Sequence, residues 1–129
     1  MTQVERVDFV AIPTRDRERA VKFNGETLGL EKNPNSTDTW VEFEAGNVTL
    51  AIVVPEEIGQ EFAPLPFGAL ALRVPDVDAA KQRLEEAGVE FRGEIFDSGV
   101  CNGAMFADPD GNGLLLHRRY APYSDGSTP

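Results

Sequence analysis

Few residues of this chain could perform acid–base or nucleophilic chemistry. The 129 residues include one histidine, His117, and one cysteine, Cys101. A single imidazole could act as a general base, because histidine exchanges a proton near neutral pH. A thiol could act as a nucleophile if a nearby base activated it, and Glu42 is a third weak catalytic candidate. One histidine and one cysteine exclude an internal disulfide, a multi-cysteine zinc site and any two-histidine site within one chain.

His117 and Cys101 also have ordinary structural interpretations. His117 precedes two arginines and could be a hydrogen-bonded side chain at the end of a strand. A lone cysteine is most often a small buried side chain. Catalytic roles for the two residues are therefore weaker hypotheses than structural ones.

The segment at residues 40–44 alternates aromatic or apolar side chains with acidic ones. If Glu42 and Glu44 face solvent, as is usual for a half-buried strand, Trp40 shares their side. A tryptophan on a polar side is expected to meet a ligand or a partner subunit. The alternation alone does not decide which side faces the core.

The alternation of side chains along a strand also places residues of the second half on common sides. Arg73 shares the side of Ala69, and His117 shares the side of Leu115. An inward arginine in an acidic protein would suit a carboxylate or phosphate ligand, and the alternative is an ion pair with a nearby acid.

These residues lie in two halves that repeat one pattern. Each half begins with an apolar strand, continues with an aspartate that can cap a helix, and ends the helix at a glycine suited to a left-handed C-cap. In the first half the strand pattern is 7–13, the aspartate is Asp16 and the glycine is Gly29. In the second half they are 67–75, Asp76 and Gly88.

Three further strands are expected after each helix. They are 29–33, 39–44 and 47–54, then 89–95, 101–107 and 113–119, with a tight turn at 108–112 (Asp-Pro-Asp-Gly-Asn). The sequence therefore predicts an α+β fold: two tandem βαβββ modules forming a curved, partly open eight-stranded mixed sheet with helices outside. The expected modules are 3–62 and 65–120, with a linker at 55–66 and a polar tail at 121–129. The concave side of such a sheet is a natural small-molecule site.

Composition places the chain among globular proteins, with 41% apolar and 26% charged residues. The net charge of −10 argues against nucleic acid and anionic membranes as partners. No stretch approaches the ~20 apolar residues of a membrane helix, and charges interrupt any signal-peptide pattern. We therefore expect a cytoplasmic location.

The combined motifs resemble the glyoxalase/bleomycin-resistance/extradiol-dioxygenase group, the vicinal oxygen chelate superfamily. The motifs are VAIP at 10–13 with Asp16, RAVKF at 19–23, LGLE at 28–31, VPDVDAA at 74–80, AGVEF at 87–91 and FADPDGN at 106–112. The resemblance covers about residues 5–120. It implies paired βαβββ modules, a dimer and often a divalent metal in the groove.

The resemblance also implies where metal ligands would lie. In metal-dependent relatives, a histidine on the first strand of each module and a carboxylate on its last strand bind the metal. The corresponding residues here are Phe9, Ala51, Ala69 and Leu115. None carries a donor atom for a divalent cation, so we expect no metal and no cofactor. The alternative is a metal held by other inward residues, such as Glu42 or His117.

We therefore expect a protein that binds a small organic molecule, as the bleomycin-resistance members do, and a homodimer, because a partner can cover open sheet edges. The alternative is a lyase, isomerase or dioxygenase of the same superfamily, either metal-dependent or metal-free with His117, Cys101 or Glu42 as the catalytic residue. The expected ligand-binding residues are Phe9, Trp40, Ala51, Ala69, Arg73, Met105, Leu115 and His117.

Overall fold

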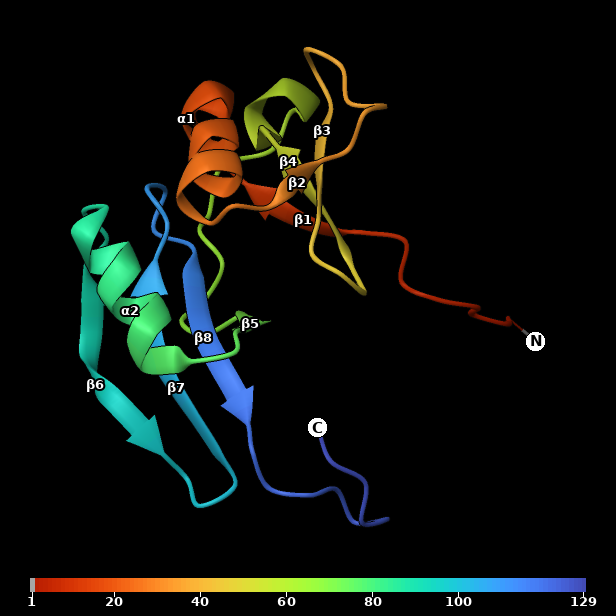
Figure 1. The fold of residues 1–129 in the computed structure, drawn as a ribbon. Helices are drawn as coiled ribbons and strands as arrows, with labels where there is room; N and C mark the ends of the chain where they lie inside the picture. Colours follow the sequence, from red (N-terminus) through yellow and green to blue (C-terminus); the bar gives the residue numbers. More distant parts are fainter. Residues whose placement is uncertain (1) are drawn as a thin grey trace. The chain divides into compact units, whose positions relative to one another are not determined.

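The structure is a computed structural model that describes residues 2–129. The chain divides into two compact units, Met1–Pro64 and Leu65–Pro129 (Figure 1). Each unit has the order strand, helix, three strands, and each has one four-stranded mixed sheet that is not closed. The predicted α+β fold of two tandem βαβββ modules is therefore confirmed.

In the first unit, the sheet has the strand order β1-β4-β3-β2. Strands β1 and β4 are parallel, and the other neighbours are antiparallel. The strands are β1 (Val10–Pro13), β2 (Glu31–Lys32), β3 (Val41–Glu44) and β4 (Thr49–Val53). The first strand begins three residues later than the sequence pattern predicted, and β2 has only two residues, because Pro34 lacks the N–H that would extend the ladder.

Helix α1 (Arg17–Lys22) begins as the sequence predicted. The Asp16 carboxylate accepts a hydrogen bond from the backbone N–H of Arg19 at 3.1 Å, which caps the first turn. The helix then widens into a π-helical segment, Phe23–Thr27. Gly25 lies in this segment against the sheet, where a Cβ would stand 3.3 Å from the ring of Phe43. The absence of a side chain at Gly25 thus allows the close approach.

In the second unit, the sheet has the order β5-β8-β7-β6, with β5 and β8 parallel. Asp76 caps the helix by accepting from the N–H of Ala79 at 3.0 Å. The elements are β5 (Leu70–Arg73), α2 (Val77–Glu86), β6 (Phe91–Asp97), β7 (Cys101–Ala107) and β8 (Gly113–Arg119). The segment expected to be a plain linker contains a 3-10 helix, Pro55–Ile58, that ends at Gly59 in a left-handed conformation. None of the helices in residues 2–129 has the length and apolar character needed to span a bilayer.

Each unit has its core on the helix side of its sheet. In the first unit, Val41 and Phe43 are buried, so the alternating glutamates Glu42 and Glu44 face the other way. The remaining buried apolar strand residues of this side are Ile12, Leu50 and Ile52, and those of the second unit are Ala104, Phe106, Leu114 and Leu116. We call the opposite side of each sheet its helix-free face.

The turn between β7 and β8 is built on one buried carboxylate. Asp108 accepts hydrogen bonds from the backbone N–H groups of Asp110 and Asn112, both at 2.9 Å, and from the Asn112 side-chain amide at 2.8 Å. The Asn112 side chain in turn accepts from the N–H of Leu65 at 2.8 Å, which ties the start of the unit to β8. Burial raises the pKa of Asp108, and the hydrogen bonds from Asn112 and Asp110 oppose that rise.

The first prediction concerns this turn. Asp108→Ala leaves buried N–H groups of Asp110 and Asn112 without an acceptor, so we expect the free energy of unfolding to fall by about 3 kcal/mol. Urea denaturation followed by circular dichroism measures it. Asp38→Ala, at an exposed carboxylate, serves as the control and should change stability by less than about 0.5 kcal/mol. Equal stabilities of the two variants would contradict the assigned role of Asp108.

Candidate functional site

The helix-free face of the first unit carries acidic and small side chains. In the sheet register, Glu42 pairs with Ala51 and Glu44 pairs with Thr49, so these four side chains share the face. Ala51 has no exposed surface, although it lies on this side. Glu42 is half-buried. The alternation that the sequence left open is thus resolved with the glutamates away from the helix.

Trp40 lies on the same side and contacts Phe9. The two ring centroids are 5.5 Å apart and the rings are nearly perpendicular. The indole Nε1–H of Trp40 donates a hydrogen bond to the Glu42 carboxylate at 2.9 Å. Trp40 is nevertheless 39% exposed and Phe9 is 45% exposed. Two large aromatic side chains are therefore presented to solvent beside a carboxylate.

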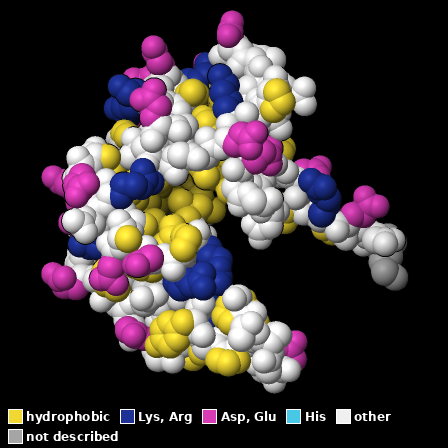
Figure 2. All heavy atoms as spheres, viewed as in Figure 1, with side chains coloured by type: hydrophobic (Ala, Val, Ile, Leu, Met, Phe, Trp, Pro, Cys, Tyr) yellow, Lys and Arg dark blue, Asp and Glu magenta, His cyan; other side chains and the backbone are white. Residues whose placement is uncertain are grey.

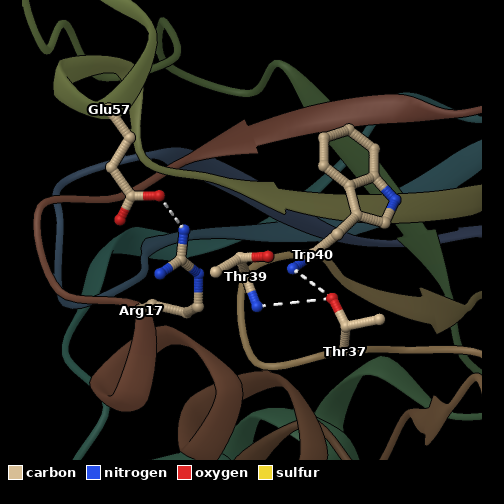
Figure 3. A network of polar contacts seen from close by, with 5 residues as sticks. All are labelled: Arg17, Thr37, Thr39, Trp40 and Glu57. Carbon is tan, nitrogen blue, oxygen red and sulfur yellow. Dashed lines mark hydrogen bonds and ion pairs between the residues drawn. The ribbon is translucent and has the colours of Figure 1, made fainter.

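The backbone around Trp40 is held by a polar network (Figure 3). The Thr37 hydroxyl accepts hydrogen bonds from the N–H groups of Thr39 at 3.4 Å and Trp40 at 3.1 Å. On the neighbouring helix, the Arg17 guanidinium donates to the Glu57 carboxylate. The indole itself points away from the Thr37 turn in this view. The turn thus fixes the backbone from which Trp40 projects.

Glu44 strengthens the negative charge of the first face. Its carboxylate accepts hydrogen bonds from the Asn33 amide at 3.0 Å and the Thr49 hydroxyl at 2.9 Å. These hydrogen bonds, that from Asn33 first, hold the pKa of Glu44 below its ordinary value. Glu31 pairs with Glu44 across the strands, which adds a further carboxylate to the face. On the side of the molecule drawn in Figure 2, acidic side chains are scattered over the surface.

The helix-free face of the second unit gathers most of the other expected binding residues. Leu115 pairs with Ala71 on one side and with Met105 on the other. His117 pairs with Arg73 in the parallel β5–β8 register. Leu115 and His117 therefore lie on the same face of the sheet, as the period of two predicted. Ala69 is exposed and lies just before β5.

Three residues on this face were not identified from the sequence. Phe96 pairs with Gly103, and its ring lies so close that a Cβ on Gly103 would stand 2.6 Å from it. Arg92 pairs with Met105, and Arg119 pairs with Cys101. Between the Arg92 and Phe96 pairs β6 advances by four residues and β7 by two, so a register shift interrupts the ladder between Arg92 and Phe96. Of these features, only the contact of Phe96 with Gly103 had a signal in the sequence, namely a glycine within a strand.

The three catalytic candidates do not form one constellation within a unit. Glu42 belongs to the first unit, and Cys101 and His117 belong to the second. Cys101 pairs with Arg119, and His117 pairs with Gly103, so the thiol and the imidazole are diagonal neighbours on β7 and β8. The backbone positions of such neighbours are about 7–8 Å apart. No hydrogen bond joins the two side chains in the part of the chain that the structure describes.

The residues at the metal positions implied by the resemblance do not fit a metal. Phe9, Ala51, Ala69 and Leu115 supply no nitrogen, oxygen or sulfur side-chain atom. Within residues 2–129, no group of three or more His, Cys, Asp or Glu side chains could hold a metal ion. A depression of about 520 Å³ in the second unit lies instead on the helix side, lined by Asp78, Lys81, Gln82, Glu85, Glu94 and Ile95.

Comparisons with known proteins agree with the fold. An antibiotic-binding protein from Streptomyces sp. CB03234 is 27% identical, with a TM-score of 0.74, covering 92% of this chain and 99% of that one. A superfamily member from Sphaerobacter thermophilus DSM 20745 is 26% identical, with a TM-score of 0.74 and coverages of 88% and 97%. A lactoylglutathione lyase from Agrobacterium tumefaciens, 19% identical with a TM-score of 0.71 and coverages of 90% and 95%, shares the fold.

A family model covers most of the chain. The sequence model of the Glyoxalase/Bleomycin resistance protein/Dioxygenase superfamily matches residues 6–116. This range contains both helices and all eight strands except the last three residues of β8. The motifs, the paired βαβββ units and this match lead to one conclusion: the chain belongs to the Glyoxalase/Bleomycin resistance protein/Dioxygenase superfamily.

Proposed function

We propose that this protein binds a small organic molecule on the helix-free faces of its sheets and does so without a metal ion. The observation that carries the proposal is the exposed pair of Phe9 and Trp40. Large aromatic side chains left in contact with water gain free energy when a ligand covers them. Phe9 lies at a position where the resemblance implies a metal ligand, and its ring suits an apolar ligand instead.

Trp40 is also preorganised. Its Nε1–H is already bound to Glu42, and its backbone N–H is bound to the Thr37 hydroxyl. An aromatic ring that is fixed before binding loses little conformational entropy when a ligand stacks on it. The first face therefore has the general form of a small-molecule site, with apolar surface and a few oriented polar groups.

The second face supports the same function with different residues. Ala71, Met105 and Leu115 form an apolar row across three strands, with Arg73 and His117 in the adjacent row. The antibiotic-binding role of the relative from Streptomyces, which is 27% identical, is consistent with a binding role here. Ala51 shares the first face with Glu42 but is fully buried, so it offers no exposed surface to a ligand.

The enzymatic alternative lacks a comparable observation. A general base or nucleophile must lie within hydrogen-bond reach of its partner group. His117 and Cys101 do not meet that condition with each other within the described residues, and Glu42 is engaged with Trp40. We therefore place a lyase, isomerase or dioxygenase activity second. A cytoplasmic location and a homodimer stay part of the proposal.

The second prediction addresses the ligand. Titration with bleomycin and a panel of planar aromatic antibiotics is expected to quench the emission of Trp40, the single tryptophan of the chain. Phe9→Ala should weaken binding of a quenching compound about tenfold, because the edge-to-face contact and the apolar area of the ring are lost. Ile58→Ala, at an exposed apolar residue of the 3-10 helix, is the control. The same affinity in both variants would argue against the aromatic pair as a binding element.

The third prediction addresses the metal. Calorimetric titration with zinc, nickel, manganese and iron(II) should give no stoichiometric binding at micromolar concentrations, because the four family positions offer no donor atoms. Tight binding that disappears in Glu42→Ala or His117→Ala would place a metal on other residues. The metal-dependent enzymatic alternative would then become the first choice.

The fourth prediction addresses assembly. Light scattering at tens of micromolar protein should report a particle of twice the 14.1 kDa chain mass. The physical reason is that the open sheet edges are favourable surfaces for a partner. A particle of one chain mass under these conditions would refute the dimer.

A further inference from the structure

The helix-free face of the second unit has an unusual charge composition. The chain has 22 acidic and 12 basic residues, yet no acidic side chain occurs at the paired strand positions of this face within the described structure. Glu94, in the register shift of β6, lines the depression on the helix side. The ionic side chains there are arginines, accompanied by His117. The strand positions of the face are Ala71 and Arg73 of β5, Gly113, Leu115, His117 and Arg119 of β8, Cys101, Gly103, Met105 and Ala107 of β7, and Arg92 and Phe96 of β6.

Two of the three arginines are already engaged by neutral groups. The Arg119 guanidinium donates to the backbone oxygen of Pro122 at 2.8 Å and lies 4.6 Å from the ring centre of Tyr123. The Arg92 guanidinium lies over the ring of Phe67, 5.3 Å from its centre. Neither guanidinium forms an ion pair with an acidic side chain of residues 2–129, but both side chains have defined positions.

Arg73 differs from the other two. Its side chain is exposed, and within residues 2–129 it makes no hydrogen bond and no ion pair. The nearby Asp76 caps helix α2 through Ala79. The ion pair with a neighbouring acid, which the sequence offered as the alternative for Arg73, is therefore not formed in this unit. A guanidinium is left available at the end of β5, beside His117.

The row next to Arg73 is apolar. Ala71, Leu115 and Met105 pair across β5, β8 and β7, and Leu115 and Met105 are half-buried. Three adjacent strands span about 10 Å, and rows of one face are about 7 Å apart. An apolar body of one or two rings would thus cover the row while a charged group attached to it reached Arg73.

We propose that this face binds an apolar organic molecule that carries one oxyanion group, such as a carboxylate, sulfonate or phosphate. Arg73 pairs with the oxyanion, and Ala71, Leu115 and Met105 contact the apolar body. The inference rests on the proposed small-molecule binding and narrows the class of ligand. A guanidinium offers two parallel N–H donors to an oxyanion, which a neutral ligand cannot use. The acid-free face matters because a net charge of −10 would otherwise repel an anion.

Two probes with the same apolar body test the proposal. One is 8-anilinonaphthalene-1-sulfonate, which carries a sulfonate, and the other is N-phenyl-1-naphthylamine, which carries no charge; both become fluorescent when bound. In the wild-type protein we expect the sulfonate probe to bind more tightly than the neutral one. Arg73→Gln should weaken the sulfonate probe about tenfold, the loss expected for a charge-assisted hydrogen bond, and leave the neutral probe unchanged.

The matched control is Arg118→Gln. Arg118 follows His117 on β8 and pairs with Asn102, so it belongs to the opposite side of the same strand. The change removes the same charge from the same unit and should leave both affinities unchanged. Equal weakening in the two variants would assign the effect to net charge and overturn the role of Arg73. Circular dichroism verifies that both variants are folded.

The methionines locate the probe on the surface. The chain has two methionines, Met1 and Met105. In protein labelled with ¹³C at the methionine methyl groups, the sulfonate probe should shift the Met105 signal in wild type. A bound probe that leaves this signal unmoved would overturn the proposed location.

The outcomes separate the two proposals. If the neutral probe binds and the sulfonate probe does not, the oxyanion inference fails and small-molecule binding stands. If the two bind equally and Arg73→Gln changes neither affinity, the oxyanion inference fails in the same way. If neither probe binds and no antibiotic quenches Trp40, both proposals fail.

Discussion

Each sheet of this protein has one helix packed against it, and this constraint determines where every candidate binding residue lies. A four-stranded sheet has two faces, and side chains alternate between them along each strand. In the first unit, Val41 and Phe43 occupy the helix side, which commits Glu42 and Glu44 to the other side. In the second, Leu114 and Leu116 are buried, which commits Leu115 and His117 to the helix-free face. The packing of the cores thus selects the residues that are presented to a ligand.

The two helix-free faces differ in chemistry. The first combines carboxylates with two exposed aromatic rings, and hydrogen bonds hold the pKa of Glu44 low. The second combines an apolar row with arginines and lacks carboxylates at its strand positions in the described structure. The two modules thus share one strand arrangement, while their helix-free faces carry side chains of opposite charge. Binding properties therefore belong to the individual face and not to the βαβββ pattern, in line with the separation of fold from function.

Small residues and capped turns make these faces possible. Gly103 lets the Phe96 ring lie directly on the sheet, and Gly25 lets the π-helical segment approach Phe43. Asp108 completes the turn that joins β7 to β8, the two strands that carry Met105 and Leu115. Each feature is local, and each allows or holds a close contact within its unit.

Much of the fold was predictable from the sequence by itself. The aspartate caps, the glycines that end the helices and the Asp-Pro-Asp-Gly-Asn turn act within a few residues, so they can be recognised directly. The period of two along a strand also predicts that Leu115 and His117 share a side. The apolar character of Phe9, Ala51, Ala69 and Leu115, which the resemblance places at the metal positions of the family, was likewise evident, because chemical type is a property of the sequence.

Only the tertiary structure decided the rest, because it depends on contacts between distant residues. The contact of Phe9 with Trp40 joins segments that are far apart in the chain, and no local pattern contains it. The register shift in β6 interrupts its pairing with β7 between Arg92 and Phe96, and no local pattern contains it. The sequence also left open whether Arg73 pairs with an acid, and the packing of its unit provides no such partner among the described residues. Residue types were thus determined by the sequence, whereas their neighbours were determined by the packing of the sheet.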